Sequence, residues 1–119
     1  MTTREIAERL VALCRAGKFV EAITELYAPD VQQSENGAPP SVGRDGLVRA
    51  CQGWLDSRVL HSMQLLGTHI ADDAFVLELK YDVTPHSTQQ RYQWAEAGVY
   101  RVRNGRITDV RFYYQPPAA

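Results

Sequence analysis

Two glutamates and one histidine in this sequence could carry acid–base chemistry, and Glu96 is the first of them. Glu96 shares strand alternation with Trp94 and Tyr100, which should face a core. A carboxylate on such an apolar face is costly unless it is paired or protonated, and desolvation raises its pKa toward that of a general acid. We predict that Glu96 lines a pocket. The alternative is a salt bridge to an arginine at the pocket mouth, Arg44 or Arg91.

His61 and Glu35 complete the predicted acid–base set. His61 belongs to the pKa class of a proton shuttle near neutral pH. It stands where a predicted helix meets a strand whose alternation is too weak to assign faces, so the alternative is a surface or hydrogen-bonded structural histidine. Glu35 ends the short segment 31–35, beside the turn-forming pair Asn36-Gly37. It either points into a pocket or lies at a solvated loop edge.

Other kinds of site have no support in the sequence. Its histidines and cysteines form no H-x-H, H-E-x-x-H or C-x-x-C spacing, and Gly43-Arg44-Asp45-Gly46 matches no phosphate-binding loop. We therefore predict no metal and no cofactor. Cys14 and Cys51 fall on apolar helical faces, where we expect each to act as a small buried hydrophobe, without a disulfide.

Length and charge narrow the class of protein further. The 119 residues suit one domain, 1–119, with 45% hydrophobic and 23% charged residues. Thirteen basic and 14 acidic residues give a net charge of -1, so we expect no attraction to nucleic acid or to anionic membranes. No apolar run is long enough for a secretory or membrane-spanning segment, and we expect a cytoplasmic protein.

Helical signals occupy the first half of the chain. Thr2-x-x-Glu5 fits a capping box, and Gly17 fits the residue that follows a helix. A second helix from about residue 19 should end at Pro29, since proline disfavours helical geometry in the residue before it. A third helix is predicted over residues 44–56.

Strand signals occupy the second half. Residues 75–83 alternate clearly, an earlier strand spans about 59–70, and residues 94–102 form a third. Asn104-Gly105 predicts a tight hairpin into a last strand, which Pro116 and Pro117 should end. Helices first and strands last indicate an α+β fold, with three N-terminal helices followed by a mostly antiparallel sheet.

Several short motifs, in this order and spacing, resemble one protein family. They are Leu26-Tyr27-Ala28-Pro29-Asp30-Val31, Gly43 before the third helix, Tyr81-Asp82-Val83-Thr84, Glu96-Ala97-Gly98-Val99-Tyr100-Arg101-Val102, Asn104-Gly105-Arg106-Ile107 and Phe112-Tyr113-Tyr114. The chain thereby resembles the SnoaL-like group of the nuclear transport factor 2-like superfamily, which includes ketosteroid isomerase, scytalone dehydratase and polyketide cyclases. The resemblance implies that the three N-terminal helices pack on a curved, mostly antiparallel sheet, forming a cone with a pocket for a small apolar molecule.

The resemblance also implies roles for particular residues. Glu35 aligns with the general-base aspartate of ketosteroid isomerase. Leu10 and Gly98 stand where that enzyme has its oxyanion tyrosine and acid, so its own reaction is not implied. We hypothesise a cofactor-independent cyclase, isomerase or dehydratase in which Glu35 is the base and Glu96, with His61 or a tyrosine hydroxyl, is the acid. The alternative is a binding module without catalysis. Epoxide hydrolysis of the limonene type needs an aspartate–arginine–aspartate set that the sequence does not assemble.

Aromatic residues should form the wall of the pocket. We predict that the substrate-binding residues are Tyr27, Trp54, Trp94, Tyr100, Phe112 and Tyr114, the alternative being a plain hydrophobic core. On the opposite sheet face we expect Val76 and Val99 among the charged residues Glu78, Lys80 and Asp82. That mixed surface, with the habit of the family, predicts a homodimer.

Overall fold

The computed structural model describes residues 1–115, which fold as three helices and six strands. The helices are α1 (Thr3–Arg15), α2 (Phe19–Leu26) and α3 (Arg44–Asp56). The strands are β1 (Tyr27–Glu35), β2 (Ser41–Val42), β3 (Arg58–Ile70), β4 (Ala74–Pro85), β5 (Tyr92–Arg103) and β6 (Arg106–Tyr114). None of these helices is long and apolar enough to cross a bilayer.

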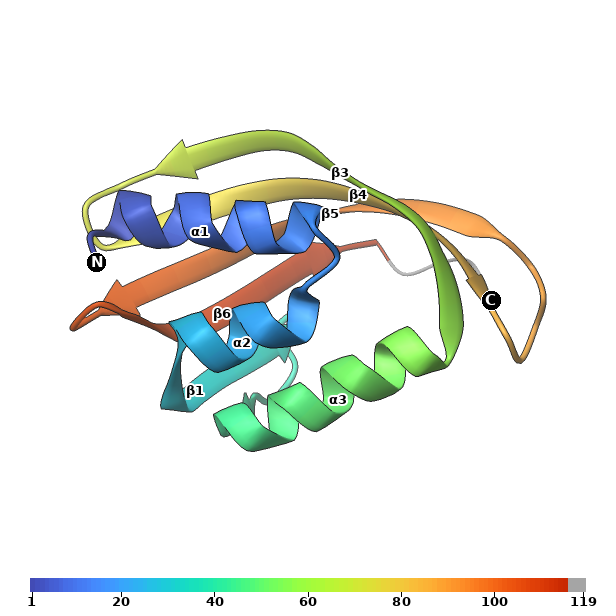
Figure 1. The fold of residues 1–119 in the computed structure, drawn as a ribbon, viewed down its shortest axis with the longest axis horizontal. Helices are drawn as coiled ribbons and strands as arrows, with labels where there is room; N and C mark the ends of the chain where they lie inside the picture. The colour runs from blue at the N-terminus through green and yellow to red at the C-terminus, as the bar shows by residue number, and fades with distance from the viewer. Residues whose placement is uncertain (116–119) are drawn as a thin grey trace.

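The six strands form one curved sheet that is not closed. Their order is β2-β1-β6-β5-β4-β3, with β3 to β6 an antiparallel meander and β1 parallel to β6. All three helices lie on the same face of this sheet (Figure 1). The predicted α+β class, with helices on a mostly antiparallel sheet, is confirmed.

The predicted capping box, helix-ending glycine and tight turn are all present at the ends of these elements. Thr2 Oγ1 accepts a hydrogen bond from the Glu5 amide at 3.1 Å, and the Glu5 carboxylate accepts one from the Thr2 amide at 2.9 Å, which completes the capping box. Gly17 takes a φ of 75° after α1. Asn104 and Gly105, with φ of 54° and 73°, form the tight turn between β5 and β6.

The end of the second helix differs from the prediction. The helix ends at Leu26, and Pro29 lies inside β1. Strand β1 pairs with β6 at Tyr27 and again only from Gln32 onward, so Pro29 occupies a stretch without regular pairing, where its missing amide proton costs no ladder bond. Pro116 and Pro117 lie outside the described residues.

The core fills one end of the space between helices and sheet. Its largest fully buried side chains are Phe75, Ile6, Leu77, Ile107, Val31, Val83 and Val110. Phe75 and Tyr100 stack with ring centroids 4.8 Å apart and planes 6° from parallel. The remaining space between the helices and the sheet stays open as a cavity.

Candidate functional site

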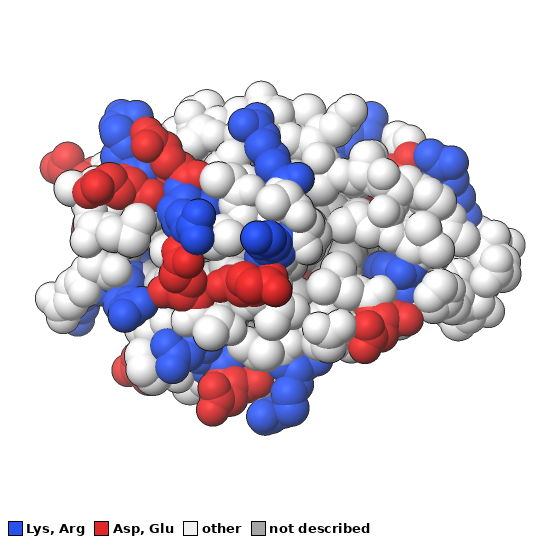
Figure 2. All heavy atoms as spheres, viewed as in Figure 1, with Lys and Arg blue, Asp and Glu red and all other residues white. Residues whose placement is uncertain are grey.

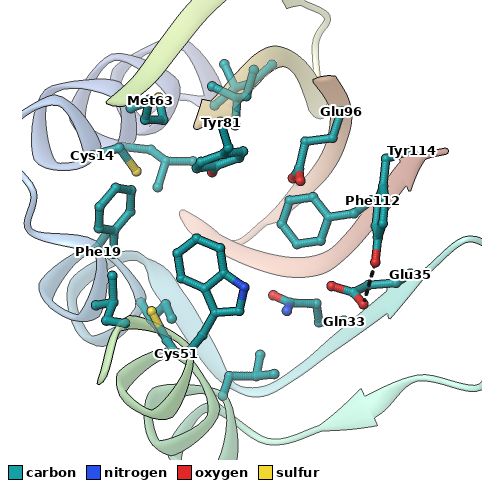
Figure 3. Close-up of a pocket in the computed structure, with 18 of the residues that line it drawn as sticks. Cys14, Phe19, Gln33, Glu35, Cys51, Met63, Tyr81, Glu96, Phe112 and Tyr114 are labelled. Carbon is teal, nitrogen blue, oxygen red and sulfur yellow. Dashed lines mark hydrogen bonds between the residues drawn. The ribbon is translucent and has the colours of Figure 1, made fainter. Parts of the chain in front are cut away.

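A cavity of about 400 Å³ lies between the three helices and the inner face of the sheet. The helices contribute an apolar wall, including Leu10, Phe19 and Cys51, and the sheet contributes the polar groups. Figure 3 shows this division: Cys14, Phe19 and Cys51 of the helices lie on one side, and Gln33, Glu35 and Glu96 of the strands on the other. The cavity lining is thus mostly apolar, and its two acidic side chains lie on the sheet side.

Glu96 points into this cavity from β5. It stands between Leu79 of β4 and Tyr114 of β6 in the sheet, and its Oε1 accepts a hydrogen bond from Trp94 Nε1 at 2.9 Å. Burial raises the pKa of Glu96; the Trp94 hydrogen bond opposes that rise, and the nearby Glu35 charge adds to it. Glu96 is therefore suited to hold a proton and donate it.

The alternative of a salt bridge for Glu96 is wrong. Arg91 binds Asp82 on the outer face of the sheet through two hydrogen bonds of 2.9 and 2.6 Å. Arg44 donates to the Tyr27 carbonyl at 3.2 Å. Neither arginine neutralises Glu96, so its carboxyl group stays available to a ligand.

Glu35 lies at the mouth of the same cavity. It ends β1 opposite Phe112 of β6, and its Oε2 accepts a hydrogen bond from the Tyr114 hydroxyl at 3.1 Å. Glu35 is exposed and also lines the cavity. The predicted position in a pocket and the alternative of a solvated loop edge therefore each describe part of its surroundings. A second bond, from the Tyr114 amide to Asn36 Oδ1 at 2.9 Å, fixes the end of β6 beside it.

His61 is not brought to the site, which corrects its prediction as a third catalytic residue. It is the additional residue of a β-bulge in β3, where Leu60 pairs with Val83 and Ser62 with Asp82. Its side chain is exposed, with Nε2 2.7 Å from Thr84 Oγ1, and it does not line the cavity. The structure therefore matches the alternative of a hydrogen-bonded surface histidine.

The six aromatic residues predicted for the pocket all line it, at different depths. Tyr27 and Tyr100 are buried against the core, whereas Trp54, Trp94, Phe112 and Tyr114 are partly exposed. Trp54 meets Trp94 edge-on at 6.3 Å, and Trp94 stacks on Tyr81 at 5.2 Å. These rings build a flat-sided aromatic wall at the open end.

Several lining residues were missed in the sequence. Gln33 and Tyr92 follow from strand alternation, two positions before Glu35 and Trp94 respectively. Arg58 had no such signal, because it lies at the junction of α3 and β3. Cys14 and Cys51 also line the cavity as unbridged thiols, and burial raises the pKa of Cys14 to about 12, which keeps it protonated.

Neither the distribution of surface charge nor the metal-ligating residues point to a second site in the part of the chain that the structure describes. In the face shown in Figure 2, acidic and basic side chains are interspersed, without a large area of either sign. Within residues 1–115, no three histidine, cysteine, aspartate or glutamate side chains group as a metal site.

A family model and a solved structure both relate this chain to SnoaL-like proteins. A family model described as the SnoaL-like domain matches residues 7–110. A Mesorhizobium loti protein provisionally assigned as a SnoaL-like polyketide cyclase is 34% identical, with a TM-score of 0.89 over 96% of this chain and 100% of that one. No match was found among curated proteins.

More distant solved structures share the fold. A nuclear transport factor 2-like protein from Burkholderia thailandensis is 21% identical, with a TM-score of 0.84 over 97% of this chain and 92% of that one. An epoxide hydrolase of the LEH-like type from M. tuberculosis is 15% identical, with a TM-score of 0.74 over 93% and 80%. At these identities the likeness concerns the fold alone.

Proposed function

This chain belongs to the SnoaL-like family, and we propose that it is a cofactor-independent acid–base enzyme of the cyclase, isomerase or dehydratase type. Its substrate would be a small apolar molecule that carries a carbonyl group. The observation that carries the proposal is that Glu35 and Glu96 line one cavity in unlike surroundings. Two carboxyl groups whose environments differ can serve as base and acid at the same pH.

In the proposed reaction, Glu35 removes a proton from the carbon next to the substrate carbonyl. The C–H electron pair moves into the new carbon–carbon double bond, and the carbonyl oxygen becomes an enolate oxygen. Glu96, whose pKa is raised by burial, donates its proton to that oxygen. In an isomerisation of a β,γ-unsaturated ketone, Glu35 delivers its proton to the γ-carbon of the dienol while the enol oxygen returns its proton to Glu96. In a cyclisation, the enol carbon attacks a second carbonyl, the enol oxygen returns its proton to Glu96, and the new alkoxide takes the proton from Glu35.

The apolar wall of the cavity supports the proposed kind of substrate. The side chains that α1, α2 and α3 contribute to the cavity lining are mostly apolar, and its acids lie on β1 and β5. A mostly apolar pocket with a few convergent polar groups is the usual form of a small-molecule site.

Exchange of substrate protons with deuterium tests this proposal without a known product. A panel of cyclic ketones and β-diketones is incubated with the protein in D₂O, and loss of the α-proton signal is followed by NMR. Catalysed exchange should fall about a hundredfold or more in Glu35→Gln and strongly in Glu96→Gln, because general acid–base groups contribute on that scale. Glu78→Gln, an exposed carboxylate outside the cavity, is the matched control and should keep full exchange.

A non-catalytic binding module, assembled as a homodimer, is the second candidate. It is favoured by Leu10, an apolar residue lining the cavity where ketosteroid isomerase has its oxyanion tyrosine. The binding module would be favoured if the protein binds a ligand but catalyses no exchange, and if Glu35→Gln and Glu96→Gln leave the ligand affinity unchanged. Epoxide hydrolysis is not proposed, because no aspartate lines the cavity within residues 1–115.

We propose the same homodimer for the enzyme. Cross-strand neighbours Val76 and Val99 form an apolar centre on the outer sheet face, and Tyr113 nearby is 46% exposed. Val99→Lys should convert a dimer to a monomer in light scattering at micromolar concentration, and Val42→Lys, on β2, should not. A wild-type monomer at that concentration would remove the proposal.

A further inference from the structure

Arg58 is a cation fixed on the aromatic wall of the cavity. It begins β3, and its Nε donates to the Trp54 carbonyl at 2.8 Å while Nη2 donates to Ser57 Oγ at 3.1 Å. Its Cζ lies 4.2 Å from the centroid of the Trp54 ring, a cation–π arrangement. Arg58 is partly buried, and its contacts with the Trp54 carbonyl, the Trp54 ring and the Ser57 hydroxyl position the guanidinium.

Arg58 has no acidic partner within residues 1–115. It is the one cation lining the cavity there, whereas Arg9, Arg91 and Arg111 all pair with carboxylates outside it. Its Nη1 makes no hydrogen bond to the described residues. A guanidinium partly removed from water gains most from a carboxylate that meets it through two parallel hydrogen bonds.

Neither cavity acid pairs with Arg58. Glu96 is bound by Trp94 and Glu35 by Tyr114. The Trp54 and Trp94 rings, 6.3 Å apart, form the wall that runs from the Arg58 guanidinium toward Glu96. A ligand lying on this wall can therefore place one end at Arg58 and the other near the acids.

We propose that Arg58 binds a carboxylate of the substrate, so that the substrate class is apolar, ring-containing carboxylic acids with a carbonyl group at the other end. This inference rests on the proposed function of the same cavity. A carboxylate fits better than a phosphate, because one guanidinium balances one negative charge. A second negative charge would lack a partner, because no other cation among residues 1–115 lines the cavity.

A purely structural role for Arg58 makes a different prediction. The contact of Nε with the Trp54 carbonyl stabilises the last turn of α3, whose exposed carbonyls favour cations. Glutamine can still donate to that carbonyl but carries no charge. Arg58→Gln thus separates a charge-based role in ligand binding from a role in ending the helix.

The test compares 2-naphthoate with 2-naphthamide, which have the same ring system and differ in charge. Calorimetric titration at pH 7 should give the wild type about ten- to a hundredfold tighter binding of the acid, the range expected for a charged hydrogen bond. Arg58→Gln should abolish that preference while binding of the amide stays within about twofold. Arg101→Gln, which removes an exposed positive charge outside the cavity, should keep the preference.

The two probes test the role of Arg58 separately from the apolar character of the ligand. If acid and amide bind the wild type equally, or if the preference survives Arg58→Gln, the role of Arg58 is overturned while the apolar pocket and its acid–base chemistry stand. If neither probe binds, the inference about Arg58 is overturned together with the apolar ligand on which it rests.

Discussion

The Tyr114 hydroxyl donates a hydrogen bond to Oε2 of Glu35 across 3.1 Å, linking the last residue of β6 to the last residue of β1. Burial raises the pKa of Tyr114, and the negative charge of Glu35 raises it further, so the phenol keeps its proton at neutral pH. The dashed line in Figure 3 marks this bond. One carboxylate oxygen of Glu35 is thereby held, and the other is left to a substrate.

Tyr114→Phe should slow the proposed proton transfer without emptying the cavity. The ring still fills its place, but Glu35 loses the donor that orients it. We expect about a three- to tenfold fall in the rate of deuterium exchange, with ligand affinity unchanged, because a hydrogen bond to a charged group is worth that much at a partly exposed site. Tyr113→Phe changes the neighbouring hydroxyl, which is exposed on the other face of β6, and should leave the rate alone.

Glu96 should make stability fall as pH rises. Its folded-state pKa is raised by burial, so its stabilising contribution is fully present below the ordinary value of 4.5 and is lost as pH rises through the raised pKa. Glu96→Gln lacks this loss. The difference in unfolding free energy between Glu96→Gln and wild type, measured by urea unfolding, should therefore shift in favour of the variant between pH 4 and pH 8. A difference independent of pH would contradict the assignment.

Asp82 should give the opposite dependence. Hydrogen bonds from Arg91 and Gln93 hold its carboxylate on the outer sheet face. The Arg91 bond contributes most, and together with the Gln93 bond and the nearby positive charge it lowers the pKa of Asp82 to about 2 against the opposing effect of burial. The stabilisation is present above the ordinary value of 3.8 and is lost as pH falls through about 2. Asp82→Asn should be less stable than wild type at pH 7, by thermal unfolding, and the gap should close in that acid range.

The order of elements could be predicted from sequence because each of its signals is local. The Thr2 capping box, the Asn104-Gly105 turn and the alternation of β4 depend on residues close along the chain. They therefore depend little on the rest of the fold. The parity arguments that brought Glu96 and the aromatic residues to the inner face work for the same reason, because the alternation of β5 is regular around Glu96.

The faces of β3 could not be predicted, because two irregularities interrupt its alternation. Register shifts between Leu60 and Ser62 and between Leu65 and Gly67 each reverse the parity of the residues that follow. His61 falls in the first, which turns it outward. Arg58 was missed for a related reason: its position depends on how α3 meets β3 and on the Trp54 ring, a contact that no sequence period reports.

Gly98 offers the sharpest test of how the cavity is built. A Cβ there would lie 2.8 Å from Tyr100 Cε2 and 3.1 Å from Phe112 Cε1, so both pocket rings would have to shift. Gly98→Ala should cost about 1–3 kcal/mol in urea unfolding, the usual range for an overpacked interior, and should weaken 2-naphthamide binding. Gly53→Ala, in α3 with nothing near its added methyl, should instead gain about 0.5–1 kcal/mol from helix propensity. Equal effects of the two substitutions would show that the rings yield without cost. If Gly98→Ala behaves as expected, an acid cannot be added at this position to rebuild the oxyanion site of ketosteroid isomerase, because the space is already occupied by Tyr100 and Phe112.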